Sequence, residues 1–152
     1  MAYAGRERRK QTAREPRRTF GQLATEAIRT RLRDTRADGA HWDASHNLVW
    51  VRWTPETGGF HFCALRRSQD YLTGEMGCSP VPVELEDLPL VESLHQAMPS
   101  GCRIRLGHVL HGHDRWWSAG GGEDSLVWRL DWLANHLRLR LMAFIAAASP
   151  PR

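Results

Sequence analysis

Two β-forming segments separated by a short turn constrain the fold of this chain more than any other feature. Residues 46–54 (HNLVWVRWT) and 60–67 (FHFCALRR) are rich in β-branched and aromatic side chains, and residues 55–59 (PETGG) between them are typical of a turn. The pattern predicts an antiparallel hairpin with a loop of about four or five residues. Because strand residues alternate in direction, we expect Leu48, Trp50 and Arg52 on one face and Val49, Val51 and Trp53 on the other.

Three further elements follow from periodicity. Residues 19–36 predict an amphipathic helix that Thr19 can cap, and residues 102–110 (CRIRLGHVL) alternate as a strand does. A long helix is expected after Gly120–Gly122, capped by Asp124 or Ser125, because leucines recur at helical spacing from residue 126 onward. The order of elements indicates an α+β fold, an antiparallel sheet of about three to five strands with both helices on one face.

The segment 68–100 is less regular. Residues 71–76 can form a short strand or a loop, and residues 78–83 are expected to be an extended edge because they contain two prolines. A short helix is predicted over about 90–97, after Pro89. Residues 19–148 are expected to form one domain, which is ordinary for a chain of 152 residues.

The positive charge is concentrated at the N-terminus. Residues 1–36 hold 11 Lys/Arg and 4 Asp/Glu, a net charge of +7, whereas the rest of the chain carries −3. Residues 1–18 contain almost no large apolar side chains, and we expect a disordered arm that could neutralise nucleic-acid phosphates. The residues that would do so are Arg6, Arg8, Arg9, Lys10, Arg14, Arg17 and Arg18.

Composition favours a cytoplasmic protein. The longest apolar stretch near the end, 141–148, is far shorter than the roughly 18 residues that a membrane span needs. No apolar segment follows the basic N-terminus, as a secretory signal would require. The three cysteines, Cys63, Cys78 and Cys102, form no CxxC pair, and we expect reduced, mainly buried thiols.

A histidine-rich stretch is the first candidate for chemistry. Three imidazoles and a carboxylate lie within seven residues, so a metal such as zinc or copper could bind there, with His61 and Cys63 completing the site. The spacing matches no zinc signature, and a solvated loop is the favoured interpretation. The candidate ligands are His108, His111, His113 and Asp114.

Two other catalytic patterns are weaker. Cys63 and His61 would share one face of a strand, but a strand interior is a poor position for a nucleophile. Gly120–Gly122 before a helix is similar to a phosphate-binding turn, yet Glu123 and Asp124 would repel an anion there. No Walker, GxSxG or HExxH motif is present, so no cofactor is implied and an enzyme is not favoured.

Two adjacent tryptophans beside an arginine indicate a recognition surface. Trp116 and Trp117 follow Arg115, and Trp and Arg are the side chains most enriched at the energetic centres of protein interfaces. Arg103 and Arg105 lie on the polar face of the preceding strand. We expect these five residues to contribute to binding, although such a tryptophan pair can also split, with one ring buried.

The string CRIRLGHVLHGHDRWW at 102–117 resembles a family of small uncharacterised bacterial domains, in which an RxRLG strand is followed by a GxDxWW loop. Coverage would be about 19–146. The family is a domain of unknown function, so the resemblance implies a fold rather than an activity, and related domains beside toxin genes suggest an immunity-like role. The matching residues are Arg103, Arg105, Leu106, Gly107, Gly112, Asp114, Trp116 and Trp117.

The sequence therefore favours a non-enzymatic cytoplasmic protein, immunity-like in character, that binds a protein partner near residues 115–117. The first alternative is a nucleic-acid-associated protein that uses the N-terminal arm. The second is a metal-binding protein or enzyme that uses residues 108–114.

Overall fold

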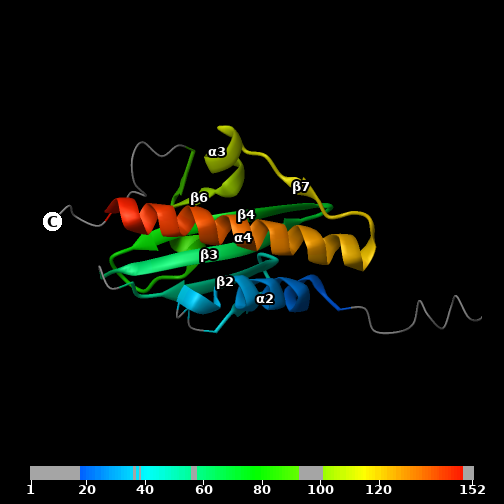
Figure 1. Ribbon diagram of the computed structural model, residues 1–152, viewed down its shortest axis with the longest axis horizontal. Coiled ribbons are helices and arrows are strands. Elements are labelled where there is room, and N and C mark those ends of the chain that lie inside the picture. The colour runs from blue at the N-terminus through cyan, green and yellow to red at the C-terminus, as the bar shows by residue number, and fades with distance from the viewer. Residues whose placement is uncertain (1–17, 36, 38, 56–57, 93–100, 149–152) are drawn as a thin grey trace, which may run out of the picture.

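The computed structural model describes residues 18–35, 37, 39–55, 58–92 and 101–148. Its centre is a seven-stranded, mostly antiparallel sheet in the order β1-β2-β3-β4-β6-β5, with β7 paired to β4 (Figure 1). The α+β class is confirmed, and the sheet has more strands than the three to five expected. The additional strands are short: β1 (His41–Asp43), β5 (Leu90–Val91) and β7 (Trp117–Ser118).

The predicted hairpin is confirmed as β2 (Leu48–Trp53) and β3 (Phe60–Ser68), which pair antiparallel with Val51 opposite Cys63. The predicted alternation also holds. Val49, Val51 and Trp53 join the main core, whereas Leu48 and Trp50 join a second, smaller core on the opposite face. Both faces of this hairpin are therefore covered.

The central strand is β4 (Tyr71–Ser79), a nine-residue strand that pairs with β3 along its whole length. Its other edge pairs with β6 (Cys102–Arg105). Of the two possibilities left open for residues 71–76, the strand is correct. The predicted extended edge at 78–83 is different, because Cys78 and Ser79 end β4 and residues 80–83 belong to no strand.

Two predictions near β6 are corrected. The strand expected over 102–110 ends at Arg105, and the chain continues as the short helix α3 (Leu106–His111), closed by Gly112 in the left-handed conformation. The helix expected over 90–97 begins instead as strand β5, which pairs in parallel with β6, and residues 93–97 lie outside the described residues.

Helix α2 (Phe20–Arg31) is capped as predicted. Thr19 Oγ1 accepts a hydrogen bond from the Gln22 backbone N–H at 3.3 Å, and the Thr19 N–H donates to Gln22 Oε1 at 2.9 Å, which together form a capping box. The apolar face that follows is buried. The helix ends at residue 31, and residues 33–35 form a 3₁₀ turn.

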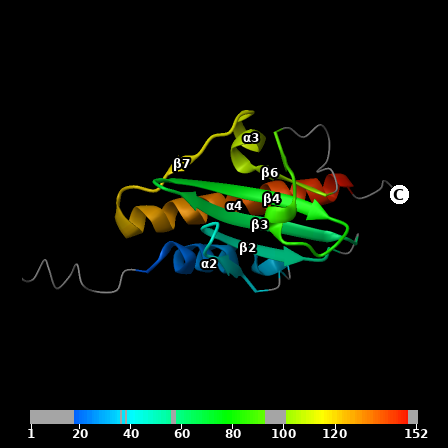
Figure 2. The same cartoon turned by 180° about the vertical axis from the view of Figure 1, so that it is seen from behind.

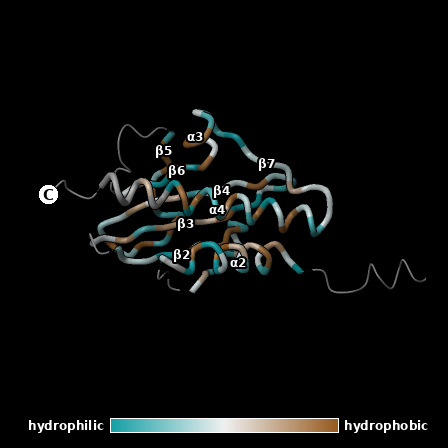
Figure 3. Tube along the Cα trace, in the orientation of Figure 1, coloured by the Kyte–Doolittle hydropathy of each residue, from teal (hydrophilic) through white to brown (hydrophobic). Residues whose placement is uncertain are grey.

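Helix α4 (Gly122–Ala148) is the predicted long C-terminal helix and begins two residues before the expected cap. Hydrophobic and hydrophilic residues alternate along it (Figure 3). The stripe expected to face the core is buried at Leu126, Leu130, Leu133 and Leu137. Gly74 on β4 lies so close to Leu137 that an added Cβ would come within 2.9 Å of that side chain.

The two helices lie side by side on one face of the sheet, as Figures 1 and 2 show from opposite sides. The bidentate ion pair between Arg31 and Asp131, with N–O distances of 2.7 and 2.6 Å, joins α2 to α4. The opposite face is covered by the strap, our name for residues 80–92. Its Leu85 and Leu88 pack on Trp50 and neighbouring side chains of the second core.

Candidate functional site

A groove of about 410 Å³ lies between the segment 115–118 and helix α4, which run side by side in Figure 1. We call it the tryptophan groove. Four of its residues are tryptophans, two from the segment 115–118 and two from α4. The lining residues are Arg115, Trp116, Trp117, Ser118, Trp128, Arg129, Trp132 and Leu133.

One wall is held in place by a close backbone contact. Gly107 in α3 packs against Arg115, and a Cβ added at Gly107 would lie 2.4 Å from the Arg115 backbone nitrogen. Strand β7 then pairs with β4, with Trp117 opposite Leu72. The wall therefore depends on α3 on one side and on the central strand on the other.

The two adjacent tryptophans have different environments. Trp117 packs toward α4, with its ring centroid 5.5 Å from that of Trp132. Trp116 lies against Arg105 on β6, whose guanidinium is 5.0 Å from the ring centroid, and its Nε1–H donates to Asp114 Oδ1 at 3.1 Å. Both rings line the groove and both are half-buried, but Trp117 packs toward α4 and Trp116 toward β6.

A row of aromatic rings continues from the groove along α4. On one side, the ring centroids of Trp117 and His111 are 6.2 Å apart, and on the other, those of Trp132 and His136 are 4.1 Å apart. Burial, followed by the charge of Arg140, lowers the pKa of His136, which favours a neutral imidazole at neutral pH. Aromatic rings therefore extend beyond the groove in both directions.

Helix α4 also exposes a second apolar stripe beside its buried one. Trp128 is 65% exposed and Leu139 is 52% exposed, and Trp132 lies between them. The spacings of four and seven residues place all three on one side of the helix. Sequence reasoning did not identify Trp128 and Trp132 as the second wall, because only the tertiary fold brings α4 opposite residues 115–118.

The charged residues of the groove are both cations. The Arg115 guanidinium lies 5.9 Å from the Trp117 ring centroid, and Arg129 donates a hydrogen bond from Nη1 to the Ser118 carbonyl oxygen. No acidic side chain is among the described residues that line the groove. Its chemistry is therefore that of an aromatic cleft with a positive rim.

The other predicted binding residues, Arg103 and Arg105, belong to a buried ion cluster on the strap side of the sheet. Its centre is Glu75 on β4, which is fully buried and accepts hydrogen bonds from Arg66 and Arg103. Arg105 Nε lies 3.6 Å from the same carboxylate. The strap adds Glu86, which also pairs with Arg66. This cluster joins β3, β4, β6 and the strap, and only Arg105 reaches the groove region, through Trp116.

The predicted metal ligands are not brought together around one point. His108 and His111 lie on α3, and Asp114 is engaged by Arg105 Nη1 at 2.9 Å and by Trp116. The His111 and His113 rings are 6.0 Å apart. Among the described residues, no three His, Cys, Asp or Glu side chains form a group that could hold a metal ion.

The remaining predicted sites offer little chemistry. Cys63 is fully buried, and burial raises the pKa of its thiol. Gly121 and Gly122 both have positive φ, and they precede the acidic first turn of α4. Of the basic arm, only Arg18 is described, and it pairs with Glu26 and Glu123. Arg6, Arg8, Arg9, Lys10, Arg14 and Arg17 lie outside the described residues.

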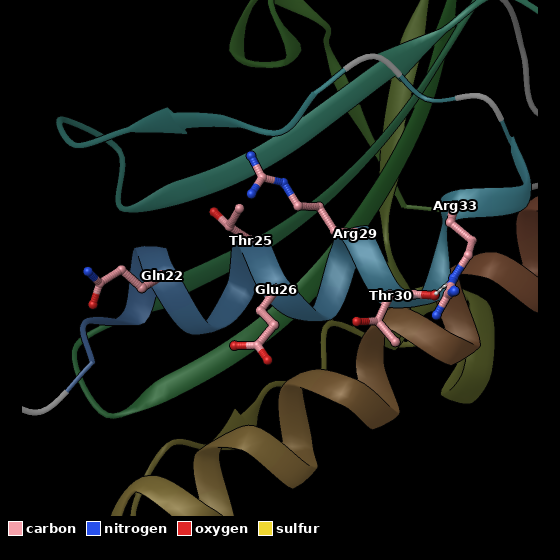
Figure 4. Close-up of a pocket in the computed structure, with 6 residues that line it drawn as sticks. All are labelled: Gln22, Thr25, Glu26, Arg29, Thr30 and Arg33. Atoms are coloured by element: carbon pink, nitrogen blue, oxygen red, sulfur yellow. Dashed lines mark hydrogen bonds between the residues drawn. The ribbon is translucent and has the colours of Figure 1, made fainter.

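A second hollow lies along the outer side of α2 and the turn after it (Figure 4). All its side chains come from this one segment, with Glu26 and Arg29 pointing to different sides of the helix. Arg33 Nε donates to the Thr30 carbonyl oxygen. Because no second element closes this hollow, it lacks the convergent groups of a binding site.

No family model, curated protein or solved structure matches the chain. The resemblance carried by residues 102–117 therefore stays a prediction. Within the described residues, no helix is both long and apolar enough to cross a membrane.

Proposed function

We propose that the chain is a binding protein that recognises an acidic, apolar-rich segment of a protein partner through the tryptophan groove. The observation that supports this most is the exposure of Trp128 at the mouth of an aromatic groove rimmed by Arg115 and Arg129. A large exposed aromatic side chain has a solvation cost that partner binding removes. Trp and Arg are also the commonest anchors of protein interfaces.

The charge of the groove indicates the partner's chemistry. Two arginines without a lining carboxylate favour a ligand with acidic side chains, which would also be drawn to the site from a distance. The exposed stripe of Trp128, Trp132 and Leu139 extends the apolar surface along α4. Such a stripe fits an amphipathic helix with apolar side chains at intervals of three or four residues.

An immunity-like role is the finer form of this proposal, in which the bound segment belongs to a toxin. It rests on the resemblance at residues 102–117. The positive rim suits it, because a protein that blocks an acidic surface needs complementary charge.

A random-peptide display library tests the proposal directly. The wild-type protein should enrich peptides that combine Asp or Glu with large apolar residues, and the Trp128→Ala variant should not. The best peptide should lose at least about tenfold in affinity with Trp128→Ala by calorimetry, as expected for an interface anchor. Trp42→Ala is the matched control, because Trp42 is also exposed but lies on β1, away from the groove.

Two results would reject the proposal. One is a library that enriches no sequence for wild type over Trp128→Ala. The other is an equal loss of affinity in Trp42→Ala and Trp128→Ala. A salt-dependent shift on RNA or DNA that disappears on deletion of residues 1–17, without any peptide binding, would favour the nucleic-acid alternative instead.

A further inference from the structure

Two cysteines face each other across neighbouring strands of the sheet. Cys78 on β4 and Cys102 on β6 are direct partners in the antiparallel register, so their side chains leave the sheet on the same face. Directly opposed residues in such a pair have Cα atoms about 4.5–5.5 Å apart. That separation lies within the roughly 4.4–6.8 Å that a disulfide spans.

Two other observations support their proximity. The Gly101 N–H donates to the Cys78 carbonyl oxygen at 2.8 Å, and Gly101 has a φ of +78°, so this turn fixes Cys102 opposite Cys78. Burial raises the pKa of Cys78 to about 11, and the neighbouring Cys102 contributes to that rise. Two thiols that influence each other electrostatically are close in space.

We propose that Cys78 and Cys102 form a reversible dithiol–disulfide pair that is oxidised by a low-molecular-weight disulfide such as oxidised glutathione. Cys78 is the attacking thiol, because it is the more accessible of the two: Cys78 is partly exposed, whereas Cys102 is only 5% exposed. The Cys78 thiolate attacks one sulfur of the oxidant, forms a mixed disulfide and releases one glutathione thiolate. The Cys102 thiolate then attacks Cys78 Sγ and releases the second. The two protons lost by the cysteines end on the two glutathione thiols.

His61 is placed to accept the first proton. It is the partner of Cys78 in the β3–β4 register, so it lies beside Cys78 on the same face. Its Nδ1 is buried and has no hydrogen-bond partner among the described residues. Burial lowers the pKa of His61, which keeps the imidazole neutral and able to take a proton at neutral pH. Because little thiolate is present at neutral pH, we expect exchange over minutes to hours rather than seconds.

The bond would join β6 to β4 shortly before β6 continues into α3. Gly107 in α3 packs on Arg115, the first residue of the groove wall. Oxidation therefore stabilises the element that positions this wall, whatever the groove binds.

The test incubates the folded wild-type protein with oxidised glutathione, blocks remaining thiols with N-ethylmaleimide under denaturing conditions, and measures intact mass. Before blocking, we expect the oxidised chain to be lighter than the reduced chain by two hydrogen atoms. After blocking, we expect one cysteine to carry N-ethylmaleimide. Cys78 and Cys102 lie in one tryptic peptide, 68–103, and Cys63 lies in another, 53–66. Cleavage of the first peptide after Glu84, Glu86 and Glu92 should leave two fragments joined until they are reduced.

Three variants define the outcome. Cys63→Ser should oxidise as wild type does, because Cys63 takes no part. Cys102→Ser should stop at the mixed disulfide and gain the mass of one glutathione at Cys78. His61→Gln should form the same bond more slowly. Three blocked thiols in the folded, oxidised wild type would overturn the proposal, and so would the loss of two hydrogen atoms by Cys102→Ser.

Discussion

The fully buried carboxylate of Glu75 accepts a hydrogen bond from Arg66 Nε at 2.5 Å, and both residues lie on the sheet face opposite the helices. Glu75 is on the central strand, and Arg103 reaches it from the other side. A buried charge is stable only when its partners are in place. This pair therefore holds the strap face of the sheet together.

Replacement of Glu75 by Gln should destabilise the fold strongly. The amide keeps the shape but leaves two arginines without their shared anion, so we expect a loss of about 3–5 kcal/mol in the free energy of unfolding. Urea denaturation measures it. Glu26→Gln is the control, because Glu26 forms an exposed ion pair worth at most about 1 kcal/mol. Equal losses in the two variants would contradict the role of the buried cluster.

The capping box of α2 gives a second prediction. Thr19→Ala removes the acceptor of the Gln22 N–H and should cost about 1 kcal/mol of unfolding free energy. Thr19→Ser keeps the hydroxyl group and should cost far less. Thermal or urea denaturation measures the stability of both variants. An equal loss in Thr19→Ala and Thr19→Ser would contradict the role of the hydroxyl group as a cap.

Gly107→Ala should disturb the groove wall. The added methyl group would overlap the backbone of Arg115, which cannot move as a side chain can. We expect a loss of about 1–3 kcal/mol in stability, as for overpacking in a core, together with weaker peptide binding. Gly39→Ala has open space around it and should change neither property. A Gly107→Ala protein with wild-type stability and binding would show that the contact is unimportant.

The Arg31–Asp131 pair between the two helices predicts a pH dependence. The hydrogen bond from Arg31, followed by its charge, lowers the pKa of Asp131 below its ordinary value. The unfolded state therefore takes up the proton first, so the contribution is complete above the unfolded pKa and disappears as the pH falls through the folded pKa. The contribution is small, because both side chains are partly exposed.

Asp131→Asn tests this dependence. Its stability should be below that of wild type at neutral pH, and the two curves should meet under acid conditions. A gap that stays constant from neutral to low pH would show that protonation of Asp131 is not its cause.

Local signals predicted the hairpin and both long helices because their residues alternate or recur within one element. The central strand β4 was harder to predict, because its sequence, YLTGEMGCS, mixes Gly, Thr and Glu without a clear period. Its buried Glu75 is tolerated only because Arg66 and Arg103 arrive from neighbouring strands. Such compensation is a property of the tertiary fold.

The same reasoning applies to the groove. Residues 115–117 were predicted as a binding surface from their composition, but their partner wall on α4 is a consequence of how the helix lies across the sheet. The end of β6 was misplaced because Leu106 continues the alternation of the strand while already belonging to α3. Periodicity cannot distinguish a strand from a single following helical turn.

The strap is attached differently from the layer on the other face. Before β5 joins the sheet, guanidinium groups bind the strap backbone at two points: Arg52 donates to the Val83 carbonyl oxygen at 3.1 Å and Arg103 to the Leu88 carbonyl oxygen at 2.9 Å. Helices α2 and α4 instead have continuous internal hydrogen bonding. Amide hydrogen exchange should therefore be faster in residues 80–89 than in α2 or α4, because the backbone hydrogen bonds within this part of the strap are confined to short turns. The strap side of the sheet is therefore expected to open locally more often than the side that α2 and α4 cover.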